Sequence, residues 1–189
     1  MQIIDNPNIK YGFTTRAIPL EEMATAVPIY APPRIGDLVL AEVQELGRHN
    51  RMEIRTGVTM SLFPGDYIVG AFGNRYATDQ YEGYVPLRPV EECDLLSVGG
   101  VCGEVASQHA SMLVDPTRLR IVGLVSDEHD RPINQRFFGL PSHAVGERLE
   151  SSAEVILVLG SSMNSGKTTT AGTLARALSR ANLSVAGAR

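Results

Sequence analysis

The sequence of 189 residues contains no tryptophan, and only 6% of its residues are aromatic. It has two cysteines, Cys93 and Cys102, too few for a fold held together by several disulfides. No apolar run is long enough to span a bilayer as a helix. The first residues also lack the basic and then apolar layout of a signal peptide. These absences predict a soluble cytoplasmic protein with two free thiols and no membrane partner.

Lysine and, towards the C-terminus, acidic residues are also scarce. Of the 17 basic residues only Lys10 and Lys167 are lysines. The formal net charge of −4 argues against a general nucleic-acid binder, whose surface is basic. Asp and Glu are absent from residues 155–189, which leaves that segment locally positive. A positive segment suits an anion-binding site.

One of the two lysines lies in a phosphate-binding pattern. Residues 155–160 are Val-Ile-Leu-Val-Leu-Gly, an uninterrupted apolar run typical of a strand that is buried on both faces. A loop ending in Gly166-Lys167-Thr168 follows, and then apolar residues spaced for one face of a helix. A strand, a glycine loop with Lys-Thr and a helix are the context of a Walker A motif.

The chemistry of such a loop assigns a role to its residues. Gly166 permits a close backbone approach to phosphate, Lys167 reaches the β- and γ-phosphates, and the Thr168 hydroxyl ligates Mg²⁺. The predicted ligand is therefore ATP or GTP with Mg²⁺. The predicted phosphate-contacting residues are Ser161, Ser162, Met163, Asn164, Ser165, Gly166, Lys167, Thr168 and Thr169.

The spacing Gly160-x5-Gly166-Lys167-Thr168 resembles the loop of dethiobiotin synthetases and cobyric-acid-synthase-like amide ligases, members of the P-loop NTPase superfamily. The resemblance covers residues 154–188, about a fifth of the chain. It implies an ATP- or GTP-dependent enzyme or switch. Those enzymes tend to place an acidic residue just after a Gly-Thr dipeptide, which Gly160-Ser161 would match, whereas this chain has Ser162 there. The branch within the superfamily therefore stays open.

The sequence divides into four parts. Residues 1–33 form a proline-containing leader, residues 34–140 are rich in strand patterns, and residues 141–153 are a polar linker with a short helix expected at 144–149. Residues 154–189 supply one β-α-β unit, whose second strand is expected at 183–188. One unit cannot cover a parallel sheet. We therefore expect the C-terminal part of a longer P-loop domain, or a second chain, to cover it.

The predicted fold class is a β-rich N-terminal domain, a small antiparallel barrel or sandwich, followed by the first β-α-β unit of a truncated α/β P-loop domain. The β-rich prediction depends on Gly-Asp turns that precede the apolar runs 38–43 and 67–70, and on a hairpin around Thr56-Gly57. Further strands are expected at 81–87, 119–126 and 133–138. A helical turn is expected at 20–26, and residues 98–113 fit either a helix or a strand.

Three other segments have candidate functions. Residues 73–82 are a polar stretch that suits either a binding loop or a structural turn, and we favour the turn. Residues 121–128 end in acidic residues, as Mg²⁺-binding strands do in NTPases, and would fit a circularly permuted GTPase with an N-terminal barrel. We favour a solvated hairpin turn. His109 could pair with Cys102 or Cys93, although core packing is the simpler interpretation.

Two functional classes remain. The chain belongs either to a nucleotide-dependent enzyme whose β domain binds a substrate or partner, or to a binding and assembly module whose P-loop is not catalytic. No residue after Thr170 suits the activation of water, so no catalytic residue is assigned and the 189-residue chain is expected to be inactive. Self-association into a homo-oligomer is one way in which the sheet could be covered.

Overall fold

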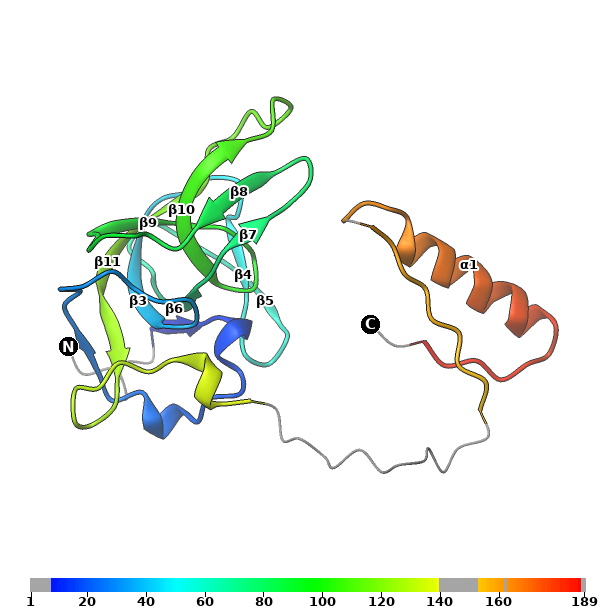
Figure 1. Ribbon diagram of the computed structural model, residues 1–189, viewed down its shortest axis with the longest axis horizontal. Coiled ribbons are helices and arrows are strands. Elements are labelled where there is room, and N and C mark those ends of the chain that lie inside the picture. The colour runs from blue at the N-terminus through cyan, green and yellow to red at the C-terminus, as the bar shows by residue number, and fades with distance from the viewer. Residues whose placement is uncertain (1–7, 140–152, 162, 188–189) are drawn as a thin grey trace. The chain divides into compact units, whose positions relative to one another are not determined.

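The computed structural model describes residues 8–139, 153–161 and 163–187. The chain divides into two compact units, residues 1–142 and 143–189. Figure 1 shows the strands in the first unit and the α-helix α1 in the second. None of the described helices is both long and apolar enough to cross a membrane.

Five strands of the first unit pair in a closed ring. The ring runs through β3 (Leu38–Glu45), β6 (Tyr67–Phe72), β10 (Val101–Gln108), β9 (Glu92–Leu95) and β11 (Thr117–Ser126), which pairs again with β3. The β-rich prediction is thus confirmed. The expectation of an antiparallel sheet was wrong, because β6 and β10 pair in parallel to close the ring.

Shorter elements extend this ring. β1 (Ile9–Tyr11) lies parallel to β6, β2 (Thr25–Val27) pairs with β11, and β8 (Tyr81–Tyr84) joins β10 to β7 (Arg75–Tyr76). β4 (Arg51–Glu53) and β5 (Thr59–Ser61) form the predicted hairpin. The 3₁₀ helices are η1 (Phe13–Thr15), η2 (Leu20–Glu22) and η3 (Gln135–Phe137). The leader therefore contributes strands to the same sheet as the domain that follows it.

The two Gly-Asp turns adopt the same local structure. Gly36 and Gly65 have φ values of 89° and 88°, in the left-handed region that glycine tolerates. In each turn the following aspartate, Asp37 or Asp66, accepts a 2.7 Å hydrogen bond through Oδ2 from the backbone N–H three residues earlier. The strands that follow, β3 and β6, pair with each other. The repeated pattern thus corresponds to a pair of neighbouring strands.

Two apolar clusters bury opposite faces of β3 and β6. Val39, Ala41 and Val43 belong to the cluster inside the ring, to which all five ring strands contribute. Leu38 and Leu40 point the other way, into a second cluster with residues of the leader such as Ile18 and Met23. Successive residues of a strand point to opposite faces, so a strand covered on both sides has an uninterrupted apolar run.

The structure revises the prediction for residues 133–138 and resolves two other segments of the first unit. Residues 133–138 are not a strand, because they form η3 after isolated bridges to β11 and to the turn before β3. Residues 98–113, which fit either a helix or a strand by sequence, contain the strand β10. The expected helical turn at 20–26 is η2 followed by β2. For β10 and β2, pairing with strands distant in the sequence decides the conformation.

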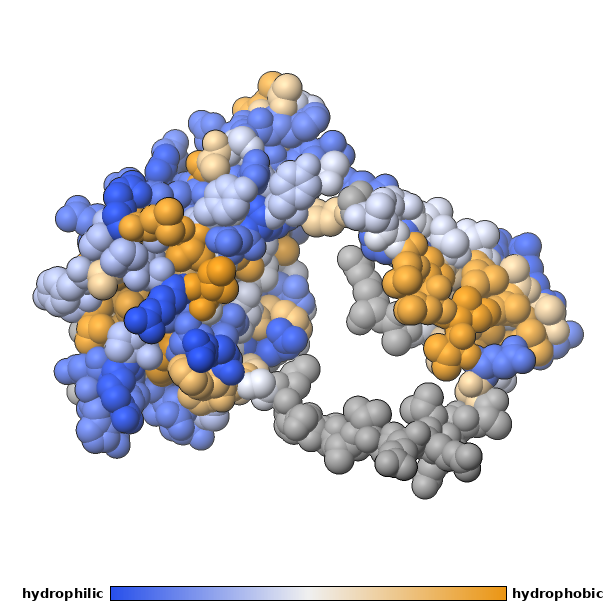
Figure 2. Space-filling model, viewed as in Figure 1, coloured by the Kyte–Doolittle hydropathy of each residue, from blue (hydrophilic) through white to orange (hydrophobic). Residues whose placement is uncertain are grey.

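In the described part of the second unit the regular element is the helix α1 (Lys167–Arg180). Within the described residues, 153–161 and 183–187 are not assigned as strands, so the predicted β-α-β unit is present only as its helix. Val155, Leu157 and Leu159 are 75–80% exposed, which is the opposite of a buried strand. Figure 2 shows hydrophobic side chains gathered on the second unit. The short helix predicted at 144–149 lies outside the described residues.

Candidate functional site

The predicted phosphate loop ends where helix α1 begins. Gly166, at the N-cap, has a φ of 82°, and its carbonyl accepts the first helical hydrogen bond, 2.9 Å from the N–H of Thr170. A glycine cap has no side chain, and no side-chain hydrogen bond caps this end. The first turn also contains no acidic residue. The positive end of the helix dipole is therefore not neutralised by a local carboxylate.

The first glycine of the motif allows the loop to close. A Cβ atom at Gly160 would lie 2.1 Å from Ser165 Oγ and 2.8 Å from Lys167 Cγ. Gly160, at the end of the apolar segment, therefore lies close to Lys167, the first residue of the helix. Beside Gly160, Lys167 Nζ donates a 3.1 Å hydrogen bond to Ser165 Oγ. Gly160, Ser165 and Lys167 therefore lie close together.

The remaining predicted loop residues are mostly accessible. Met163, Asn164 and Ser165 are exposed, as are Thr168 and Thr169 in the first turn of α1. Asn164 has a φ of 60°, so the described residues of the loop include two in the left-handed region, Asn164 and Gly166. Ser162 lies outside the described residues. Such a turn can point successive N–H groups at an anion, with the lysine and the helix terminus adding positive charge.

The polar stretch 73–82 is part of the framework of the barrel. Arg75 donates to the Leu96 carbonyl and, at 3.0 Å, to Gln80 Oε1. Asn74 Oδ1 accepts a hydrogen bond from the backbone N–H of Val85, the residue after β8. The bond to Leu96 and the pairing of β8 with β10 attach this segment to the ring, and the other two bonds are local. The segment is therefore a hydrogen-bonded turn, the interpretation that we favoured from the sequence.

Asp127, the acidic residue that follows β11, also takes part in hydrogen bonds within its own turn. Asp127 Oδ1 accepts 2.9 Å hydrogen bonds from the N–H groups of His129 and Arg131, and Oδ2 pairs with the Arg131 guanidinium. These bonds lower the pKa of Asp127 to about 2. Among the described residues no cluster of three or more His, Cys, Asp or Glu side chains is arranged to hold a metal ion. The turn is thus a solvated hairpin.

The thiols do not form a nucleophile with His109. His109 is half-exposed and faces Asp79 at 3.8 Å and Ser111. Cys93 and Cys102 are buried in the core and are not disulfide-bonded. Hydrogen bonding to Cys102 and burial raise the pKa of the Cys93 thiol, which keeps it protonated and unreactive. Both cysteines serve as core residues.

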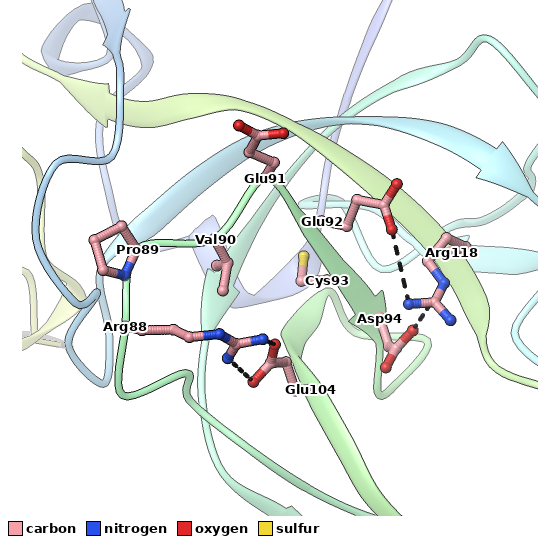
Figure 3. A pocket seen from close by; sticks show the side chains of 9 residues that line it. All are labelled: Arg88, Pro89, Val90, Glu91, Glu92, Cys93, Asp94, Glu104 and Arg118. Carbon is pink, nitrogen blue, oxygen red and sulfur yellow. Dashed lines mark hydrogen bonds and ion pairs between the residues drawn. The ribbon is translucent and has the colours of Figure 1, made fainter.

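The structure also contains a surface feature that the sequence did not indicate. Two adjoining hollows of about 400 and 520 Å³ share Asp94, Glu104 and Arg118. Figure 3 shows Arg88 and Glu104 facing each other, and Arg118 reaching between Glu92 and Asp94. These side chains come from β9, β10, β11 and the segment before β9. In the sequence, the only sign of this surface is that Glu92 and Asp94 are two residues apart, which places both acids on one face of a strand.

Asp94 is the most buried acid of these hollows. Its residue is 5% exposed, and Oδ2 accepts a 2.9 Å hydrogen bond from the N–H of Val105. Its other oxygen, Oδ1, is buried without a hydrogen bond, 3.7 Å from Arg118 Nε. Burial raises the pKa of Asp94, although the Val105 bond and Arg118 oppose the rise. A buried carboxylate with one unsatisfied oxygen is costly.

Comparison of the chain with protein-family models, with curated proteins and with solved structures found no match.

Proposed function

We propose that residues 161–169 bind the phosphates of a nucleotide, ATP or GTP, with Mg²⁺ held by the Thr168 hydroxyl. The observation that carries the proposal is the closure of the loop, in which a side chain at Gly160 would collide with Ser165 and Lys167. Lys167 bonds to Ser165 of the loop, and the helix N-terminus that follows has no side-chain cap. Both features support binding of a compact polyanion.

Within the same proposal the chain binds nucleotide without hydrolysing it. Hydrolysis needs a positioned water, a held metal ion and stabilisation of charge on the γ-phosphate. Residues 155–189 contain no carboxylate, and the acidic turn at Asp127 is occupied by its own hydrogen bonds. The barrel would then serve as a module for a substrate or a partner. This favours a nucleotide-binding module over a nucleotide-hydrolysing enzyme.

Calorimetry with Mg²⁺-ATP and Mg²⁺-GTP tests the proposal. Lys167→Ala removes the cation at the start of α1 and should weaken binding at least 10-fold, because phosphate contacts of this kind are charge-assisted. The matched control is Arg180→Ala, which removes one positive charge from the last turn of the same helix. It should bind like the wild type.

Equal affinity of the wild type and Lys167→Ala would refute the phosphate-loop proposal. Turnover by the purified chain, abolished by Lys167→Ala, would instead show that the chain is catalytically complete.

A further inference from the structure

The two hollows on the barrel form a strongly acidic surface. Six carboxylates and two guanidinium groups line them, with a net formal charge of −4: Glu45, Glu91, Glu92, Asp94, Glu104, Asp115, Arg88 and Arg118. The shared residues lie where the hollows meet, and further carboxylates lie to either side. The acidic surface is therefore an extended track and not a single point.

Strand pairing explains why these acids gather on one face. Cys93 and Leu95 of β9 point into the core, so Glu92 and Asp94 point outward. Arg118 of β11 lies directly opposite Asp94 in the register. On the other side β10 brings Glu104 close to the same strand, since Gly103 pairs with Asp94. The outer face of β9 is thus the floor of the track.

The two arginines of the track are held differently. Arg88 forms a bidentate pair with Glu104, at 2.7 and 2.8 Å. Arg118 lies 4.0 Å from Glu92 and 3.7 Å from Asp94 Oδ1, too far for a hydrogen bond to either. Its side chain is 50% exposed. Arg118 therefore neutralises Asp94 only in part and leaves Oδ1 without a donor.

We propose that this track binds a linear polyamine, with one ammonium group donating to Asp94 Oδ1 and the others paired with the acids on either side. Arg118 moves toward Glu92 to admit the ammonium group. A polyamine fits because its charges are spaced along a flexible apolar chain, as the carboxylates are spaced along two adjoining hollows. A compact divalent cation fits less well, since no described cluster offers three convergent ligands.

Calorimetry of the full chain with spermidine tests this proposal. We expect saturable 1:1 binding, at least 10-fold weaker in Asp94→Asn, whose amide oxygen can still accept the bond from Val105. The matched control is Glu128→Gln, which makes the same charge change on a side chain 82% exposed and outside the track. It should bind like the wild type. n-Butylamine, which carries a single ammonium group, should bind at least 10-fold more weakly than spermidine.

A second variant tests the proposal even if Asp94→Asn fails to fold. The double variant Glu45→Gln/Glu91→Gln removes one exposed acid from each hollow and should weaken spermidine binding at least 3-fold. Absence of saturable binding, or wild-type affinity in a folded Asp94→Asn protein or in the double variant, would overturn the proposal. Equal affinity for Mg²⁺ would also overturn it, because it would indicate non-specific electrostatic attraction of cations.

Discussion

At the scale of single residues, Gly160 determines how closely the apolar segment approaches Lys167. A methyl group there meets Ser165 Oγ, which can rotate away, but also Lys167 Cγ at 2.8 Å and Cδ at 3.1 Å, so the lysine side chain must move as well. If the proposed function is correct, Gly160→Ala should displace Lys167 and weaken Mg²⁺-ATP binding at least 10-fold, measured by calorimetry.

The control for that variant is Gly172→Ala, in the middle of α1. A Cβ at Gly172 meets nothing within 4 Å. The substitution should stabilise the helix by about 1 kcal/mol and leave the affinity for nucleotide unchanged. If both variants bind like the wild type, the closure at Gly160 is irrelevant to binding.

His49 is a buried neutral side chain whose protonation should destabilise the first unit. Burial, reinforced by the Arg75 guanidinium 3.4 Å away, lowers the pKa of His49 to about 4. Between about pH 6.5 and pH 4 the unfolded chain therefore binds a proton that the folded chain does not. The free energy of unfolding should fall by up to about 3 kcal/mol as the pH falls through this window.

Urea unfolding at pH 7 and pH 4.5 measures this effect. His49→Gln should show a smaller loss of stability than the wild type over the same interval, because the titrating group is gone. The control is His129→Gln, whose side chain is 66% exposed and which should behave like the wild type. An identical pH dependence in wild type and His49→Gln would contradict the assignment.

At the scale of elements, the parallel contact between β6 and β10 closes the ring. Gly70 lies in β6 beside this contact, where a Cβ would be 2.6 Å from the Gly100 carbonyl oxygen and 2.7 Å from Cys102 Sγ. Gly70→Ala should therefore force the strands apart and destabilise the unit by about 2 kcal/mol.

A shift of the denaturant midpoint at constant m-value measures that cost. Gly139→Ala is the control, since a Cβ at Gly139 meets nothing within 4 Å. Unchanged stability of Gly70→Ala would show that the ring tolerates an opening between β6 and β10.

At the scale of the whole molecule, the first unit has its own core. Both apolar clusters lie entirely within residues 8–139, and the leader strands complete the second cluster. A protein comprising residues 1–142 should fold alone, with a β-type circular dichroism spectrum and a single cooperative thermal transition. A disordered or predominantly helical spectrum would contradict this expectation.

Much of the first unit was predictable because its signals are local. The glycine of each Gly-Asp turn supplies the φ value that the turn requires, and the hairpin around Thr56-Gly57 pairs strands only a few residues apart. Helix α1 was predictable for the same reason, since its periodicity and its glycine cap lie within one segment. These elements follow from interactions between residues close in sequence.

Tertiary structure alone decided the rest. The parallel contact of β10 with β6, the strand conformation of residues 101–108 and the acidic track around Asp94 all depend on residues distant in the sequence. The apolar segment 155–160 matches a buried strand by composition, yet its described residues have no strand assignment, since a strand needs a neighbour to pair with. The sequence by itself determined the turns, the hairpin and the helix α1. Pairing and burial between distant segments decided the ring and the surface formed on it.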